Sequence, residues 1–201
     1  MYLWRKLNEH QRDELLAFRR FNNRPWHSPP HFENQNGRYL LSAACYEHRH
    51  FIGKTPKRLA GFSDQLLKTL GTHSDEIYAW CVLPNHYHAL LLTRELPELL
   101  REIGRLHGRT AFDWNGEDNE RGRKVWFNCV ETGMKSDRHF RATLNYVHHN
   151  PVHHGYARQW QDWPFSSASA YLTKMGRKAA VELWKAYPIR EYGKDWDPPN
   201  L

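Results

Sequence analysis

Cysteine is scarce in this chain, whose 201 residues contain only Cys45, Cys81 and Cys129. The three lie far apart and form no CxxC pair. Zinc fingers need closely spaced ligand pairs, and small secreted domains need an even set of pairing cysteines. The sequence therefore excludes both classes. Its cysteine usage is typical of a reducing compartment, and we expect a cytoplasmic protein.

Long apolar runs are also missing, since none approaches the roughly 20 residues that a membrane-spanning helix needs. The first residues, MYLWRKLNEHQRDELL, lack the apolar centre of a secretion signal. With 40% hydrophobic and 25% charged residues, the composition is that of a globular protein. We therefore expect no membrane contact and one domain with appended segments.

Acidic residues are outnumbered, because 22 Asp and Glu stand against 29 Lys and Arg and leave a net charge of +7. Most of the excess lies in residues 1–70, which hold 12 Lys and Arg against 6 Asp and Glu. Basic surfaces attract polyanions, most commonly nucleic acid. Nine Trp and ten Tyr add rings on which unpaired bases can stack. Charge alone leaves a merely solvated basic surface equally open, and most aromatic side chains are simply core.

Hydrophobic periodicity and turn residues predict the secondary structure. We expect strands at residues 38–48, 76–83, 86–93 and 125–131. Helices are expected at residues 9–21, 63–71, 96–114 and 136–150, the last one ended by Pro151.

From residue 38 onward the expected order is strand, helix, strand, strand, helix, strand, and then a further helix. This order is typical of a ferredoxin-like α+β sandwich, a split βαβ fold with an antiparallel sheet. The two strands around Pro84 would form a hairpin and place the second of them at an inner position. We expect this domain at residues 37–172, with an N-terminal extension at 1–36 and a C-terminal tail at 173–201.

Two histidines interrupt the apolar run AWCVLPNHYHALLLT, which covers residues 79–93. Alternation along a strand points His86 and His88 the same way and Tyr87 to the opposite face. Two imidazoles on one face of a strand can bind one metal ion. They can equally be partly buried histidines with hydrogen-bond partners, and a lone HxH pattern does not decide between these readings.

The predicted helix at 136–150 carries a second pair of polar residues. At about 100° per residue, Phe140, Leu144 and Val147 form the core stripe. Tyr146 and Asn150 lie one turn apart on a neighbouring stripe, at the edge of the helix. A tyrosine at the core edge and an asparagine ending a helix would explain them as structural residues. Together with the histidines, they suggest a metal-dependent tyrosine nucleophile.

These stretches resemble a known family. LPNHYHALLL resembles the HUH motif (His, hydrophobic residue, His) of single-tyrosine DNA transposases. LNYVHHNPVHHGY resembles the tyrosine-bearing helix of the REP-associated tyrosine transposases, a branch of that superfamily with a Tyr-x-x-x-Asn-Pro signature. VWFNCVE and WPFSSASAYL also look like this branch. The resemblance covers roughly residues 38–172, and the order and spacing of its motifs are specific.

The resemblance implies roles for four residues. His86 and His88 would bind a divalent metal, Asn150 would complete the site, and Tyr146 would be the nucleophile. The implied substrate is single-stranded DNA with a palindromic, REP-like hairpin, cleaved beside the hairpin through a 5′-phosphotyrosine. Such a protein would be associated with the nucleoid, as a monomer or a homodimer.

The residue types suit this chemistry. A metal held by neutral imidazoles can polarise the scissile phosphate. A phenol, with an ordinary pKa of about 10, is a better leaving group than a serine alkoxide when the strand is rejoined. Two histidines and one amide without a carboxylate predict weak metal binding. We expect Mg²⁺ or Mn²⁺ as the cofactor, with Mn²⁺ tolerating imidazole better.

Basic residues of the domain are candidates for contacts with DNA phosphates. They are Arg38, Arg49, Lys54, Lys57, Arg58, His153 and His154. The two histidines stand where similar proteins often carry Lys or Arg, so they would contact phosphate only weakly at neutral pH. The histidine-rich tract can also bind stray transition metal.

Three other functions compete with this interpretation. An HxH pattern also opens metal hydrolases built on a barrel of about 250 residues, which this chain is too short to form. A structural zinc domain would need ligands for a closed tetrahedral site, which the sequence lacks. A non-catalytic hairpin-binding protein derived from a transposase remains the main alternative.

Overall fold

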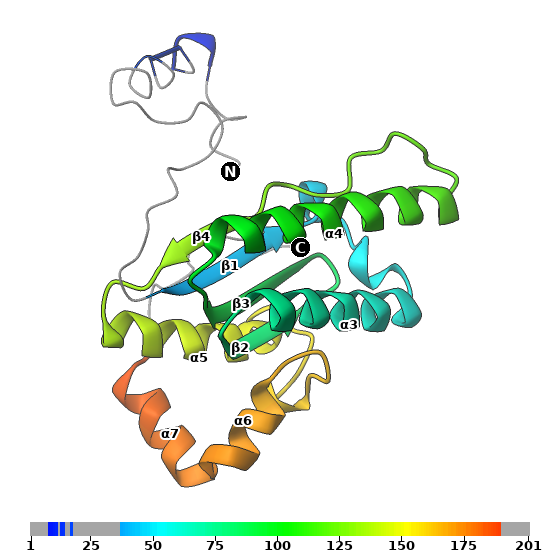
Figure 1. The fold of residues 1–201 in the computed structure, drawn as a ribbon. Helices are drawn as coiled ribbons and strands as arrows, with labels where there is room; N and C mark the ends of the chain where they lie inside the picture. The colour runs from blue at the N-terminus through cyan, green and yellow to red at the C-terminus, as the bar shows by residue number, and fades with distance from the viewer. Residues whose placement is uncertain (1–7, 12, 15–16, 18–36, 190–201) are drawn as a thin grey trace. The chain divides into compact units, whose positions relative to one another are not determined.

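The computed structural model describes residues 8–11, 13–14, 17 and 37–189 (Figure 1). By its contacts the chain divides into two units, Met1–Glu33 and Asn34–Leu201. In the first unit the described residues from Glu9 to Ala17 are helical. Asn8 and Gln11 cap this segment reciprocally, with each backbone N–H donating to the other's side-chain oxygen. The rest of the helix expected at 9–21 lies outside the described residues.

The second unit is built on a four-stranded antiparallel sheet with the order β2-β3-β1-β4. The strands are β1 (Arg38–Ala44), β2 (Glu76–Val82), β3 (His86–Leu92) and β4 (Val130–Gly133). With one helix between β1 and β2 and another between β3 and β4, this is the split βαβ arrangement predicted from the sequence. The hairpin around Pro84 places β3 between β2 and β1, as expected.

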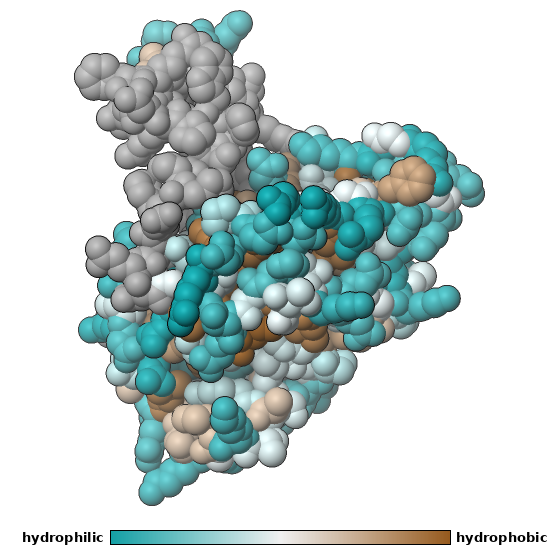
Figure 2. All heavy atoms as spheres, viewed as in Figure 1, coloured by the Kyte–Doolittle hydropathy of each residue, from teal (hydrophilic) through white to brown (hydrophobic). Residues whose placement is uncertain are grey.

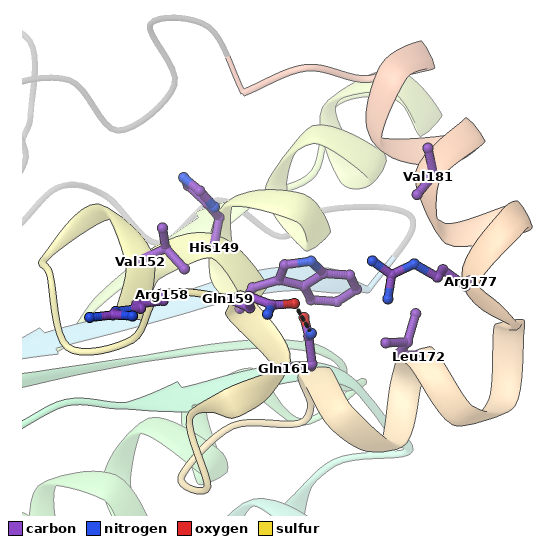
Figure 3. A pocket seen from close by; sticks show the side chains of 9 residues that line it. His149, Val152, Arg158, Gln159, Gln161, Leu172, Arg177 and Val181 are labelled. Atoms are coloured by element: carbon purple, nitrogen blue, oxygen red, sulfur yellow. Dashed lines mark hydrogen bonds between the residues drawn. The ribbon is translucent and has the colours of Figure 1, made fainter.

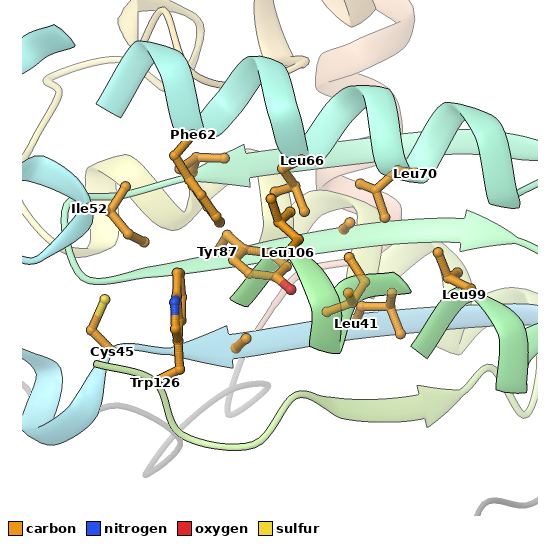
Figure 4. Close-up of a cluster of buried hydrophobic side chains, with 14 of the residues drawn as sticks. Leu41, Cys45, Ile52, Phe62, Leu66, Leu70, Tyr87, Leu99, Leu106 and Trp126 are labelled. Carbon is orange, nitrogen blue, oxygen red and sulfur yellow. The ribbon is translucent and has the colours of Figure 1, made fainter. Parts of the chain in front are cut away.

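Helices cover both faces of the sheet (Figure 1). The helices α3 (Pro56–His73) and α4 (Leu96–Glu117) enclose the larger core with side chains such as Leu41 and Tyr87, as Figure 4 shows. On the other face, α5 (Asp137–His153) packs against Leu40 and Leu90. Strand alternation therefore sends Tyr87 into the first core and its two histidine neighbours toward α5.

The first helix of the domain begins earlier than its predicted start at residue 63. The Thr55 hydroxyl oxygen accepts a hydrogen bond from the N–H of Arg58 at 3.1 Å, and Pro56 occupies the first helical turn. Thr-Pro is a strong start signal, because the hydroxyl caps the helix and proline needs no hydrogen-bond acceptor there. Ser63 lies inside the helix and donates to the carbonyl of Leu59 at 2.8 Å. The prediction of the start was wrong because it took Ser63 or Asp64 for the start signal.

The prediction that Pro151 ends α5 was also wrong, since the helix continues to His153. Ser136 caps its start by accepting from the N–H of His139 at 3.1 Å. Pro151 falls in the last turn, where it costs one backbone hydrogen bond without preventing the next. The carbonyl of Asn150 accepts from the N–H of His154 at 3.1 Å, so the final turn still closes.

Two strand boundaries differ from the sequence prediction. The strand β1 ends at Ala44, because residues 46–48 turn away with positive φ values of 55° at Glu47 and 51° at His48. Of the strand expected at 125–131, only Val130 and Glu131 belong to β4, while Trp126 pairs with Cys45 through an isolated bridge. Alternating apolar residues indicate an extended segment, but they do not show which part of it forms backbone hydrogen bonds with a neighbouring strand.

Two further helices follow α5, namely α6 (Ala168–Met175) and α7 (Arg177–Ala186). Gly176, with φ 77°, makes the turn between them. The expected boundary after Leu172 falls inside α6, so it marks no structural break. None of the helices in the described part of the chain is long and apolar enough to span a membrane.

The face shown in Figure 2 is mostly hydrophilic, with hydrophobic residues visible in the seams between elements. Large hydrophobic side chains that are exposed among the described residues are Phe112, Met175 and Val181. Scattered residues of this kind are normal on protein surfaces.

Candidate active site

The sheet and α5 bring four of the predicted residues together. His86 and His88 point from β3 toward α5, and both are almost completely buried, with 2% and 3% exposed surface. Tyr146 and Asn150 project from α5 toward them and are 5% and 0% exposed. The two pairs come from segments about 60 residues apart, and each contributes neighbours on one face of a regular element.

The side chains contact each other in matched pairs. The Tyr146 hydroxyl lies 3.2 Å from Nε2 of His88, and Oδ1 of Asn150 lies 2.9 Å from Nε2 of His86. The ring centroids of the two histidines are 5.2 Å apart. His86 and His88 are two residues apart on β3, and Tyr146 and Asn150 are one turn apart on α5. Because these two spacings match, both contacts form at once.

The Nδ1 atoms of His86 and His88 contact different side chains. Asn85 Oδ1 lies 2.8 Å from Nδ1 of His86, while Asn85 Nδ2 donates to the carbonyl of His48 at 3.1 Å. The second bond fixes the amide orientation, so Oδ1 accepts from a protonated Nδ1. Ser42 Oγ lies 2.7 Å from Nδ1 of His88. This leaves Nε2 of His86 with its lone pair directed toward Asn150.

Burial keeps both imidazoles neutral. Loss of solvent lowers the pKa of His86 to about 4, and the nearby His48 opposes its protonation further. The pKa of His88 is held well below its ordinary value, first by burial and then by His86. Neutral imidazoles retain the lone pairs that a metal ion requires.

The donor set fits a divalent ion of the magnesium or manganese type. No cluster of three or more His, Cys, Asp and Glu with metal-binding geometry occurs in the described ranges, so an all-protein cage is absent there. Two neutral imidazoles and one amide oxygen form a partial set instead. Ligands at right angles around an ion with bonds of about 2.1 Å lie about 3 Å apart. His86 Nε2 and Asn150 Oδ1 are 2.9 Å apart.

The amide of Asn150 faces His86. Its Oδ1 faces the lone pair of His86, and its buried Nδ2 has no hydrogen-bond partner within the described structure. Two facing acceptors are stabilised by a cation between them. In the metal-free protein, rotation of the amide by 180° would let Nδ2 donate to His86 instead.

More histidines surround this centre. The ring centroid of His154 is 4.8 Å from that of His86, and His153 is 4.9 Å from His154. His48, buried and in a left-handed conformation, is 6.4 Å from His86. His154 therefore lies against the centre itself, while His153 is exposed beside it.

The other expected DNA contacts lie at both ends of β1, because Arg38 is its first residue and the remaining ones follow its last. Arg49, Lys54 and Lys57 are exposed, and Lys54 pairs with Asp118 at 2.7 Å. Arg38 lies on β1, 3.4 Å from Asp137 and with its guanidinium 4.7 Å from the centre of the Phe140 ring. The role of these residues in DNA binding stays a prediction.

Arg58 is a correction, because its side chain is inside the fold. It is only 6% exposed, and it bonds Asp118 at 2.8 Å and Glu117 at 2.6 Å. A guanidinium held by two carboxylates is not available to a phosphate. Basic character in the sequence does not distinguish such a structural arginine from a surface one.

Asn85 and Ser42 were missed by sequence reasoning. A signal for Asn85 existed, because it directly precedes the first histidine in a tight turn. No local signal pointed to Ser42, since its contact depends on the pairing of β1 with β3, which sets Ser42 opposite His88.

Comparison with known proteins concerns the family and the fold of the chain. The chain is 31% identical over 96 residues to a REP-associated tyrosine transposase of Escherichia coli. It is 28% identical over 113 residues to a Haemophilus influenzae protein named after the same family. The chain is similar to the REP-associated tyrosine transposases. The resemblance predicted from its motifs is thereby confirmed.

These matches are partial. Each covers 46% of this chain and 58% or 53% of the relative, so the chain spans little more than half the length of the curated proteins it matches. No family model matches. A solved structure of a REP-associated tyrosine transposase bound to a REP hairpin aligns with a TM-score of 0.57 and 19% identity, over 75% of this chain and 86% of that one. This likeness confirms the fold.

Proposed function

We propose that the chain is a metal-dependent endonuclease and strand transferase for single-stranded DNA, with Tyr146 as the nucleophile. The observation that carries the proposal is the contact of Tyr146 with His88 beside that of Asn150 with His86, at 3.2 Å and 2.9 Å. Tyrosine, two neutral imidazoles and an amide oxygen converge in one buried centre. A purely structural core has no need for all four.

Each residue has a defined part in the proposed reaction. His86, His88 and Asn150 would hold a divalent metal, which when bound would polarise the scissile phosphate and stabilise developing charge. The Tyr146 oxygen forms a bond to phosphorus, and the proton of its hydroxyl passes by way of solvent to the leaving 3′ oxygen. The bond from phosphorus to the 3′ oxygen breaks, and that oxygen leaves as a 3′-OH. The product is a 5′-phosphotyrosine, which a second 3′-OH can reverse to join strands.

The proposed substrate is single-stranded DNA beside a palindromic hairpin. A solved protein of the same fold is bound to a REP hairpin, and the present chain has an excess of basic residues. An attack on phosphorus requires a strand whose backbone can enter the site, which an intact duplex does not offer. Exposed Arg49 and Lys57 would contact its phosphates.

The site must open to admit DNA, because Tyr146 is only 5% exposed. His154 lies against His86 from the loop that follows α5, where Gly155 has φ 73°. We propose that this loop moves when the strand binds. A glycine in the left-handed region lets the backbone turn there without steric cost.

A non-catalytic hairpin-binding protein is the second candidate, and Tyr146→Phe separates the two. The change removes one hydroxyl and keeps the buried ring, so folding and hairpin binding should persist. Cleavage of hairpin DNA with a single-stranded flank, in Mg²⁺ or Mn²⁺, should fall by at least about 1,000-fold, since the nucleophile is lost. The measurement is a denaturing gel that resolves the product and the covalent protein–DNA adduct.

Tyr156→Phe serves as the matched control. Tyr156 lies near the same centre, with its hydroxyl 3.1 Å from Nε2 of His50. The Tyr156→Phe variant should cleave hairpin DNA like the wild type. Peptide mapping should find the adduct at Tyr146, and an adduct at another tyrosine would refute the assignment. Hairpin binding without any cleavage by the wild type would favour the non-catalytic alternative.

A further inference from the structure

A pocket lies at the C-terminal end of α5, on a different side of the helix from the one that faces His86 and His88. It has a volume of about 220 Å³ and is formed by α5, the segment after it, α6 and α7 (Figure 3). His149 approaches from α5, Leu172 from α6 and Arg177 from α7, while Gln159 and Gln161 come from the connecting segment. Nothing in the proposed reaction uses these residues.

Trp160 supplies a fixed aromatic surface in this pocket. Its ring stacks on that of His148, with centroids 5.8 Å apart and planes at 28°, and lies 6.4 Å from the ring of Tyr171. His148 is buried and its Nε2 is held 2.9 Å from Oγ of Ser167. The indole is therefore supported from behind, and the rest of its partly exposed surface lines the pocket.

Polar groups around the indole suit a base and a phosphate. The amides of Gln159 and Gln161 are linked by one hydrogen bond of 2.6 Å, and each retains further donor or acceptor capacity. Arg158 and Arg177 are exposed, and neither has an ion-pair partner within the described ranges. Lone guanidinium groups beside an aromatic ring are typical of sites that bind unpaired nucleotides.

The size and position of the pocket restrict which ligand can bind there. The volume is below the range of about 300–1,000 Å³ that drug-sized ligands occupy, so one flat ring fits better than a larger molecule. Val152, which also lines the pocket, follows Tyr146 by six residues, or about 9 Å along the helix axis. A strand that passes over Tyr146 can therefore reach the pocket with a neighbouring nucleotide.

We propose that this pocket binds one unpaired nucleotide of the DNA strand, with its base stacked on Trp160 and its phosphate at Arg177. The inference rests on the proposed function and extends it, because it names the surface that would select a single-stranded flank over a blunt hairpin.

The test measures binding by fluorescence anisotropy with two labelled probes, a blunt hairpin and the same hairpin with a single-stranded flank. Trp160→Ala should weaken binding of the flanked probe by about 10-fold, the range for loss of one stacked base. Binding of the blunt hairpin should be unchanged, which also verifies that the variant is folded. In the wild type, an abasic site at one flank position should reproduce the loss, and it should add nothing in Trp160→Ala.

A second pair of variants tests the pocket without relying on Trp160→Ala alone. Arg177→Ala should weaken binding of the flanked probe by several-fold, whereas Arg109→Ala, an exposed arginine of α4 with the same charge change, should not distinguish the two probes. Phe112→Ala is the matching control for loss of an exposed aromatic ring. Unchanged flank binding in both Trp160→Ala and Arg177→Ala would overturn the inference and leave the proposed function standing. A wild-type chain that binds neither probe would overturn both this inference and the proposed function.

Discussion

At the scale of single residues, the candidate centre depends on two side chains outside the His-x-His and Tyr-x-x-x-Asn-Pro patterns. Asn85 and Ser42 occupy Nδ1 of His86 and His88, at 2.8 Å and 2.7 Å. A hydrogen bond at one imidazole nitrogen determines which nitrogen keeps its lone pair. Outer partners of this kind commonly change metal affinity by about 10- to 100-fold. We therefore regard Asn85 and Ser42 as positioning residues.

Asn85→Ala should weaken Mn²⁺ binding by about 10-fold or more, because the ring of His86 loses the acceptor that orients it. His86→Ala should abolish the binding, since a ligand is removed. Titration calorimetry with Mn²⁺ in the absence of DNA measures both effects apart from catalysis.

The control for Asn85→Ala is Asn115→Ala. Asn115 is also buried and also makes two side-chain hydrogen bonds, to the backbone carbonyl and the guanidinium of Arg123, but it lies on α4. Both variants should lose about 1–3 kcal/mol of stability from unpaired buried groups. Equal Mn²⁺ affinities in the two variants would show that Asn85 has no role at the centre.

At the scale of elements, a buried carboxylate joins the start of α3 to the end of α4. Asp118 is 3% exposed and bonds Lys54 at 2.7 Å, Arg58 at 2.8 Å and Arg123 at 2.7 Å. The hydrogen bond from Arg58 is the main cause that holds the pKa of Asp118 well below its usual range, and burial opposes this effect. Two of the seven candidate DNA contacts, Lys54 and Arg58, belong to this cluster.

Asp118→Asn should lower the free energy of unfolding by about 3 kcal/mol, because the cluster keeps its cations and loses the charge that compensates them. Urea unfolding at pH 7 measures the change. Glu98→Gln provides the comparison, since its ion pair with Arg101 is on the surface of α4 and is worth less than about 1 kcal/mol. Similar losses in the two variants would contradict a structural role for the cluster.

At the scale of the whole molecule, the fold keeps several histidines neutral in its interior. Burial lowers the pKa of His107 to about 3, and burial likewise lowers that of His148 to about 3. His107 lies in the larger core, where its ring stacks on Trp126 at 4.1 Å between centroids and its Nε2 is 3.2 Å from the Tyr87 hydroxyl. Unfolding exposes these rings to water and restores their ordinary pKa.

Stability should therefore fall as the pH drops from about 6.5 toward 4. In this range the unfolded chain binds protons that the folded chain excludes, so acid favours unfolding. Each buried histidine adds up to about 1.4 kcal/mol per pH unit to the slope. His107→Gln should make the dependence shallower by about that amount. Urea unfolding at several pH values measures both slopes, and parallel curves for the variant and the wild type would contradict the prediction.

Much of the site followed from local periodicity in the sequence. A strand must place His86 and His88 on one face, and a helix must place Tyr146 and Asn150 one turn apart, whatever surrounds them. The order of strands and helices likewise predicted the sheet, because connections of these lengths leave few topologies. These features depend on backbone geometry within a few residues, which the sequence alone determines.

Only the tertiary structure decided which distant groups meet. Ser42 contacts His88 across 46 residues because β1 pairs with β3 in one register, and a shift by one residue would turn Ser42 away. Arg58 is buried because α4 ends beside the start of α3 and places its C-cap residue Asp118 against the guanidinium. The Trp160 pocket exists because α6 and α7, which the pattern did not predict, fold back beside α5. Such contacts depend on how elements pack, and packing is a property of the whole chain that no local pattern carries.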